Sequence, residues 1–192
     1  MYELKEDFFY QTIAEYGACC VDYYLLGDED PYQGEQSHRN AILCAMNISS
    51  VRFDESWDVD IEKAKARIID AKDLLAFPDK PWKHERHGVV LYDNVYENGK
   101  IPYWYAFLEP PFGTAAVIKD GKVLRNKYGK EDFDIVNRAL FPEGTEQLIV
   151  CEWTTDWSDY FDDGHEWWGA ACWSIYDPKM DRYVVIMVSA TD

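Results

Sequence analysis

The chain has 192 residues, of which 47% are hydrophobic and 16% aromatic, and its formal net charge is -17 at pH 7. A chain of this length buries about 70% of its unfolded surface, so it can build one domain with a full core, and its aromatic content excludes an intrinsically disordered protein. The negative charge argues against nucleic acid or a membrane surface as a partner and favours a basic protein or a cation. The same charge is also typical of a surface that only keeps a protein in solution.

The N-terminal and cysteine patterns predict a cytoplasmic protein. Residues 1–7 lack the basic start and apolar stretch of a signal peptide, and no apolar run approaches the ~20 residues that span a bilayer. The cysteines are odd in number and form no CxxC pair, which favours buried free thiols. They are Cys19, Cys20, Cys44, Cys151 and Cys172. Because Cys and His do not cluster as zinc ligands do, we expect no cofactor and no required transition metal.

Three helices are predicted in the first 80 residues. Apolar side chains near helical spacing predict the first over residues 7–24 and the second over about residues 36–48. The third, residues 61–76, has the clearest pattern, because apolar residues form one stripe and charged residues cover the other face. Asp58 or Asp60 would cap it. The Pro-containing segment 77–81 then marks an internal division between a helical part, residues 1–80, and a β-rich part, residues 81–192, of a single domain.

From His87 onward the pattern changes to strands and hairpins. Runs of β-branched and aromatic residues predict strands at residues 89–92 and 101–108, joined by a turn at Asn98-Gly99. Residues 115–118 and 122–124 flank Asp120-Gly121, a second hairpin signal. Residues 131–140 are predicted to form a helix with one apolar face.

Residues 146–192 supply the predicted centre of the sheet. Apolar runs predict strands at residues 148–151, 167–176 and 183–188. Both faces of the second are largely apolar, which is typical of a central strand covered on both sides. We expect the third to be internal as well, because an edge strand with so unbroken an apolar run would favour aggregation. The fold class is therefore predicted to be α+β, with a mainly antiparallel sheet and N-terminal helices packed on it.

An acidic-aromatic segment, residues 153–166, is predicted to form a long exposed loop between the first two of these strands. No Lys or Arg occurs between Arg138 and Lys179, whereas a solvated surface normally mixes both signs. Its candidate binding residues are carboxylates, two aromatic residues and a histidine: Asp156, Trp157, Asp159, Tyr160, Asp162, Asp163, His165 and Glu166.

Three interpretations of this loop are open. A basic partner would be held by the carboxylates and by exposed aromatic residues, since interface centres are rich in Trp and Tyr. The aromatic residues Trp157, Tyr160 and Phe161 can equally fold back onto the core. A cation would need several carboxylate oxygens, although the spacing of an EF-hand loop is absent. The third interpretation is a solvated loop without a ligand.

Signals for catalysis are less specific. His165 with Glu166 and the aspartates could act in general acid–base catalysis, but no Ser or Cys nucleophile with a recognisable motif accompanies them. His84 and His87 form an H-x-x-H pair, which falls short of the three or four ligands that zinc requires. The aromatic residues of the second and third strands favour a core, with an aromatic-walled pocket as the alternative. They are Trp167, Trp168, Trp173, Tyr176 and Tyr183.

Three strings in the C-terminal half carry a resemblance to other proteins. They are YWYAFLEPP at residues 103–111, DWSDYFDDGHEWWG at residues 156–169 and the ending SATD at residues 189–192. Together they resemble a group of uncharacterised proteins from Firmicutes-type bacteria, from which no functional residue can be transferred. In composition the chain is also similar to the small, acidic, aromatic-rich immunity proteins of bacterial toxin systems.

The leading hypothesis is a non-enzymatic cytosolic binding protein, similar to an immunity protein, whose acidic-aromatic loop meets a basic protein. The alternative is a hydrolase-like enzyme that uses the Asp/His cluster, with or without a divalent cation. A third hypothesis is a protein that holds a small ligand in an aromatic-walled pocket.

Overall fold

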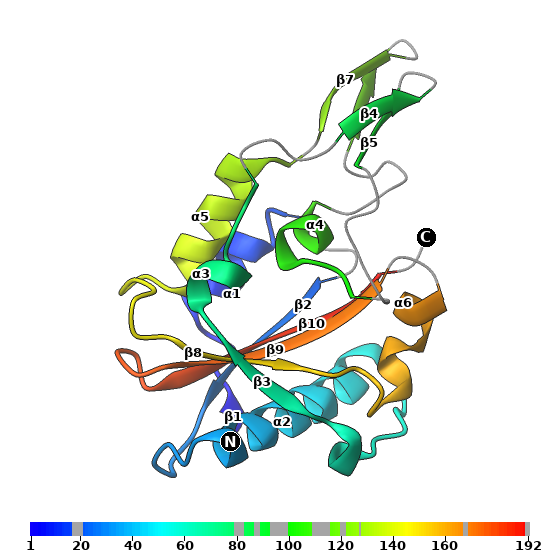
Figure 1. Ribbon diagram of the computed structural model, residues 1–192. Helices are drawn as coiled ribbons and strands as arrows, with labels where there is room; N and C mark the ends of the chain where they lie inside the picture. The colour runs from blue at the N-terminus through cyan, green and yellow to red at the C-terminus, as the bar shows by residue number, and fades with distance from the viewer. Residues whose placement is uncertain are drawn as a thin grey trace.

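A six-stranded antiparallel sheet with helices on both faces forms the body of the protein, and two hairpins project from one end of it (Figure 1). The computed structural model describes residues 1–16, 21–78, 83–86, 89–92, 100–108, 116–119, 122–126, 128–166 and 169–190. The fold class is α+β with a mainly antiparallel sheet, as the sequence predicts.

The strand order of the sheet is β1-β2-β10-β9-β8-β3, so strands from the two ends of the chain meet at its centre. The strands are β1 (Tyr2–Glu3), β2 (Val21–Gly27), β3 (Ala66–Ile69), β8 (Ile149–Trp153), β9 (Gly169–Asp177) and β10 (Arg182–Ala190). Strand β10 pairs with β2 on one side and with β9 on the other, which confirms that it is internal. The sheet draws strands from residues 1–80 and from residues 81–192 alike.

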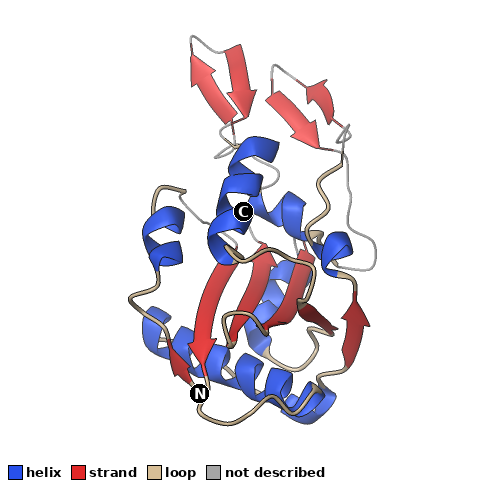
Figure 2. Ribbon diagram, turned by 90° about the vertical axis from the view of Figure 1, so that its left-hand side faces the viewer, coloured by secondary structure: helices blue, strands red, loops and turns tan. Residues whose placement is uncertain are grey.

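Helices cover the two faces of the sheet unequally (Figure 1, Figure 2). The long helix α2 (Glu35–Phe53) lies along one face, and α1 (Phe8–Ile13), α4 (Tyr103–Phe107) and α5 (Lys130–Leu140) lie on the other. The remaining elements are short: η1 (Ile61–Lys63), α3 (Ala71–Leu74), η2 (Asp159–Phe161) and α6 (Asp162–Glu166). The hairpins are β4 (Lys83–Arg86) with β5 (Val89–Tyr92), and β6 (Ala116–Lys119) with β7 (Lys122–Asn126).

The sheet separates two hydrophobic cores, because successive side chains of a strand point to opposite faces. On β9, Ala171, Trp173 and Ile175 belong to the core under α1, α4 and α5, whereas Cys172 and Tyr176 belong to the core under α2. All nine residues of β9 are buried. The prediction of a central strand covered on both faces is therefore confirmed for β9, while Trp167 and Trp168 lie outside the described residues.

Several other predicted elements are confirmed. The second helix is α2, which runs five residues further than predicted, to Phe53. The helix at residues 131–140 is α5, and the strand at residues 89–92 is β5. Strands β6 and β7 flank Asp120-Gly121 as predicted, although these two residues and the Asn98-Gly99 turn lie outside the described part of the chain.

Two predicted N-terminal helices are wrong in large part. Among the described residues of the range 7–24, Phe8–Ile13 are helical, whereas Val21–Gly27 form strand β2. Five consecutive residues of β2, Tyr23–Gly27, are buried. A strand that is covered on both faces lacks the alternation of apolar and polar residues that would distinguish it from a helix. Residues 61–76 form η1, β3 and α3 instead of one helix. Pairing of β3 with β8 overrides the helical propensity of this segment.

The predicted strand at residues 101–108 is also wrong, because Tyr103–Phe107 form helix α4. All five helical residues are buried, so this short apolar run has no polar face. Its sequence therefore shows neither the period of a helix nor that of a strand. Pro102 stands at the N-cap, where its missing N–H costs no hydrogen bond.

A buried polar network ties α2 to the centre of the sheet. His38 of α2 is fully buried, and its Nδ1 lies 2.9 Å from the hydroxyl of Ser174 on β9. Trp153 Nε1 of β8 donates to the same hydroxyl at 2.8 Å, and the hydroxyl of Tyr32 lies 3.2 Å from His38 Nε2. Burial lowers the pKa of His38 from 6.5 to about 4, because the imidazolium would lose its hydration.

We expect this lowered pKa to make the fold acid-sensitive. Above pH 6.5 the imidazole of His38 is neutral in both states. As pH falls from 6.5 to about 4, the unfolded chain binds a proton that the folded chain does not, so stability falls by about 3 kcal/mol. Urea unfolding at a series of pH values checks this against His38→Gln, which removes the titrating group. Equal pH slopes for the two proteins would show that His38 does not titrate differently on folding.

Deleting β10 tests its internal position. Removal of residues 182–192 would expose β2, β9 and both cores, so we expect an insoluble product or the loss of a cooperative thermal transition in circular dichroism. A control that lacks only residues 191–192 keeps β10 and should melt like the full chain. Cooperative melting of the shorter product would contradict the prediction.

Candidate functional site

The predicted acidic loop is joined to a second acidic segment, residues 54–62. The backbone N–H of Asp60 donates to the carbonyl of Trp157 at 2.8 Å, and the N–H of Asp58 donates to Asp159 Oδ1 at 2.8 Å. Val59 and Ser158 form an isolated antiparallel bridge between the same segments. Two acidic stretches about 100 positions apart in sequence are therefore held side by side.

Helix α2 fixes the second segment in place. Arg39 donates to the carbonyl of Ile61 at 2.7 Å and to the carbonyl of Ala64 at 3.1 Å. Its guanidinium also lies 5.2 Å from the ring centroid of Trp153, a cation–π distance. Arg39 thus ties η1, at the end of the second acidic segment, to α2 and to the sheet.

Between the two segments lies a cavity of about 310 Å³, here called the acidic cleft. Five aspartates and Lys63 line it, together with Trp157, Ser158 and His165: the aspartates are Asp58, Asp60, Asp156, Asp159 and Asp162. Lys63 Nζ lies 3.2 Å from Asp60 Oδ2, so its charge is directed at one of the five. The cleft therefore keeps a strong negative charge.

The carboxylates of the predicted binding residues are all exposed. Asp156, Asp159 and Asp162 line the acidic cleft, whereas Asp163 and Glu166 lie on α6 without lining it. The sequence did not identify Asp58 and Asp60 as part of this site, because both were interpreted as caps of a helix that does not form. The density of acidic residues over residues 54–62 was the signal for them.

The aromatic residues of the same segment face inward. The interpretation that Trp157, Tyr160 and Phe161 fold back onto the core is therefore correct. Trp157 is 1% exposed, Tyr160 8% and Phe161 0%, and all three belong to the core under α2. The Tyr160 hydroxyl donates to Asp22 Oδ2 at 2.5 Å. Trp157 and Tyr160 therefore hold the acidic segment on the body of the protein, and the expectation of a long exposed loop is wrong, since residues 159–166 form η2 and α6.

His165 is the histidine that lines the acidic cleft beside the aspartates. Its Nε2 lies 2.7 Å from the hydroxyl of Thr155, and its Nδ1 lies 3.9 Å from Asp162 Oδ1. A histidine beside a carboxylate can exchange protons with a ligand. Ser158 also lines the cleft, but its hydroxyl accepts from the backbone N–H of Tyr160 and is buried. Hydrolysis by this Asp/His cluster stays a prediction.

Other candidate residues contribute less to a site. Among the described residues, no group of three or more His, Cys, Asp or Glu side chains is placed to hold a metal ion. The side chains of His84 and His87, and Cys19 and Cys20, lie outside the described residues. Cys151 is a buried free thiol, and burial raises its pKa to about 11, so it is a poor nucleophile.

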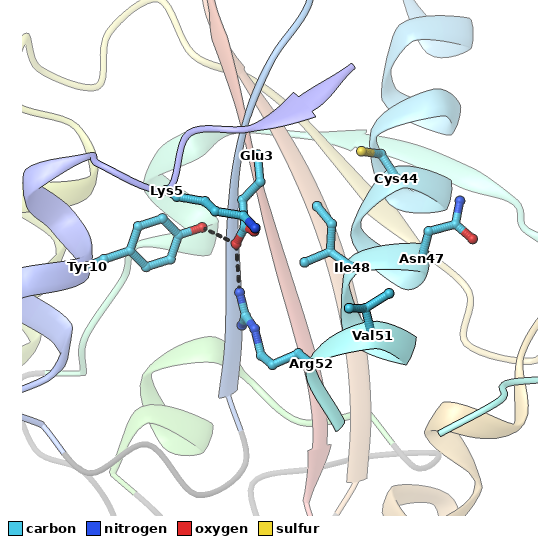
Figure 3. A pocket seen from close by; sticks show the side chains of 8 residues that line it. All are labelled: Glu3, Lys5, Tyr10, Cys44, Asn47, Ile48, Val51 and Arg52. Carbon is cyan, nitrogen blue, oxygen red and sulfur yellow. Dashed lines mark hydrogen bonds and ion pairs between the residues drawn. The ribbon is translucent and has the colours of Figure 1, made fainter. Parts of the chain in front are cut away.

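A second cavity, of about 690 Å³, lies between the N-terminal segment and α2 (Figure 3). Arg52 Nη2 pairs with Glu3 Oε1 at 2.8 Å, and the Tyr10 hydroxyl donates to the same oxygen at 3.2 Å (Figure 3). Burial raises the pKa of Tyr10 to about 12, which keeps this donor protonated. Because these three polar groups satisfy one another, we interpret this network as a tie between β1, α1 and α2.

Comparison with protein-family models, with curated proteins and with solved structures found no match to this chain. In the described part of the chain, no helix has both the length and the apolar character needed to cross a membrane.

The join between the two acidic segments gives a testable effect on stability. Asp159→Ala removes the acceptor for the N–H of Asp58, so we expect a loss of about 1 kcal/mol and a Tm lower by about 2–4 °C. Asp159→Asn keeps an oxygen at the same place and should melt close to the wild type. Thermal melts of the two variants check this, and equal Tm values for Ala and Asn would contradict a role for this hydrogen bond.

Proposed function

We propose that the protein binds a basic protein partner through the acidic cleft and the carboxylates around it, as a non-enzymatic binding protein similar to an immunity protein. One observation carries the proposal: two acidic segments from distant parts of the chain are fixed side by side by backbone hydrogen bonds. Together they present ten exposed carboxylates: Asp54, Glu55, Asp58, Asp60, Glu62, Asp156, Asp159, Asp162, Asp163 and Glu166.

Holding like charges together is unfavourable for folding. The arrangement is therefore better explained by binding to a cationic partner than by a contribution to the stability of the fold. A concentrated negative field attracts a cationic partner over a distance of about 8–10 Å at physiological ionic strength. The carboxylates are mounted on a backbone that is fixed by Arg39 and by the core side chains of Trp157 and Tyr160. The partner therefore meets acceptors that are already placed, which lowers the entropic cost of binding.

The burial of the aromatic residues changes the expected mode of contact. The contact residues are carboxylates that accept hydrogen bonds from Lys and Arg of the partner, without a central aromatic anchor from this segment. Binding of this kind depends on encounter rate and on salt more than on buried apolar area.

The test compares two triple variants that remove the same number of charges. Asp159→Asn, Asp162→Asn and Asp163→Asn together remove charge from the proposed surface. The control Glu6→Gln, Glu15→Gln and Glu131→Gln removes charge on or beside α1 and α5, on the opposite face of the sheet from α2. A basic partner is first captured from the source cell, and its association rate is then measured by stopped flow or biosensor at several salt concentrations.

We expect the first variant to associate about tenfold more slowly at low salt and the control to associate nearly as fast as the wild type. The difference should shrink as salt rises, while the Tm of the first variant stays close to that of the wild type, since exposed charges contribute little to folding. Equal slowing in both variants would indicate a response to net charge alone and would contradict a specific surface.

A further inference from the structure

A third cavity, of about 750 Å³, lies at the β3 edge of the sheet on the face that carries α4, here called the aromatic cleft. Its apolar walls include Phe77, Tyr103, Trp104 and Trp173. The rings of Phe77 and Trp104 are 5.4 Å apart, and those of Tyr103 and Trp173 are 6.1 Å apart. Phe77 is half-buried, so this wall stays accessible, while the other three aromatic residues form a buried back wall.

The strand register places charged side chains next to this wall. Arg67 of β3 is opposite Glu152 of β8, and Glu152 is opposite Trp173 of β9. The three side chains therefore form one row on the same face of the sheet. Lys100 reaches this row from the segment before α4, where its backbone forms an isolated parallel bridge with Ala170.

Two cations at the mouth of the cleft share a single carboxylate oxygen. Arg67 donates to Glu152 Oε2 from Nη2 at 2.6 Å and from Nε at 3.0 Å, and Lys100 Nζ lies 3.4 Å from the same atom. The side chains of Arg67 and Lys100 are 70% and 57% exposed, whereas that of Glu152 is 17% exposed. Because Arg carries five N–H donors and Lys three, both cations present further donors toward solvent.

We propose that the aromatic cleft binds a small aromatic carboxylate. Its ring lies against Phe77 and Trp104, and its carboxylate accepts from Lys100 and from the outer edge of the Arg67 guanidinium, beside the position that Glu152 occupies. The planar guanidinium matches the geometry of a carboxylate, and the volume is within the range of pockets for small ligands.

The charge of the whole chain makes this choice of ligand specific. At a net charge of -17 most of the surface repels an anion. Arg67 and Lys100 are two cations at one hollow with aromatic walls, opposed there by Glu152 and by Asp73 of α3, which also lines the cleft. A bound anion would be attracted by Arg67 and Lys100 at short range and repelled by Asp73. Removal of either cation should therefore weaken binding, and removal of the Asp73 charge should strengthen it.

The test uses isothermal titration calorimetry of the full chain with three probes. Phenylacetate carries both the ring and the carboxylate, phenylacetamide keeps the shape without the charge, and cyclohexylacetate keeps the charge without the aromatic ring. We expect phenylacetate to bind saturably and about tenfold or more tightly than phenylacetamide, since the charged hydrogen bonds are lost in the amide. Cyclohexylacetate should bind more weakly than phenylacetate.

Variants of the protein separate this site from general charge effects. Lys100→Gln and Arg67→Gln should each weaken phenylacetate binding about fivefold, and Asp73→Asn should strengthen it about twofold, because it removes a repulsive charge. Lys72→Gln is the matched control, since Lys72 stands on α3 with its side chain 88% exposed and does not line the cleft. Its affinity should equal that of the wild type, and thermal melts confirm that each variant is folded.

Three outcomes would overturn the proposal. They are the absence of saturable binding of phenylacetate, equal affinity for phenylacetate and phenylacetamide, and a loss in Lys72→Gln as large as that in Lys100→Gln.

Discussion

The architecture depends on one constraint: the central strand pair β9–β10 is apolar on both faces, so both faces must be covered. The two strands pair over nine consecutive positions, and every residue of β9 is buried. The nineteen-residue helix α2 covers one face together with the short η2 and α6, whereas α1, α4 and α5 cover the other face. This requirement explains why residues 103–107 form a helix with five buried residues, since that segment works as a cover for Trp173 rather than as a further strand.

The sequence predicts the C-terminal strands β8, β9 and β10 correctly, but it misses β2, which is also covered on both faces. The apolar runs of β8, β9 and β10 are long and flanked by turn residues, so their type follows from composition. Residues 61–76 show the opposite case, because a helical stripe of Ile and Ala is also compatible with an edge strand once β8 offers a partner. Such pairings between distant segments leave no local trace in the sequence, and they decide the structure wherever local propensity is weak.

The acidic segment shows how a spacing can be informative and still be overlooked. Trp157, Tyr160 and Phe161 stand at positions i, i+3 and i+4, the spacing of one face of a helical turn, and all three point into the core. Asp159 between them, and Asp156, Asp162 and Asp163 on either side, are left exposed. The aromatic residues could therefore have been assigned to the core from sequence alone. The acidic density over residues 54–62 marks Asp58 and Asp60, but their position beside residues 156–162 arises from hydrogen bonds between segments about 100 positions apart, which the sequence does not show.

Several arginines of this acidic chain hold its structure together. Arg182 is 2% exposed, pairs with Asp7 at the start of α1 and donates to the carbonyl of Leu140 at the end of α5. Arg52 lies 4.5 Å from the ring centroid of Tyr24 and pairs with Glu3. With these cations engaged inside the fold, the carboxylates of the acidic cleft keep a largely uncompensated field. Arg67 and Lys100 at the aromatic cleft differ from these arginines, because both side chains are exposed and their pairing with Glu152 contributes little stability.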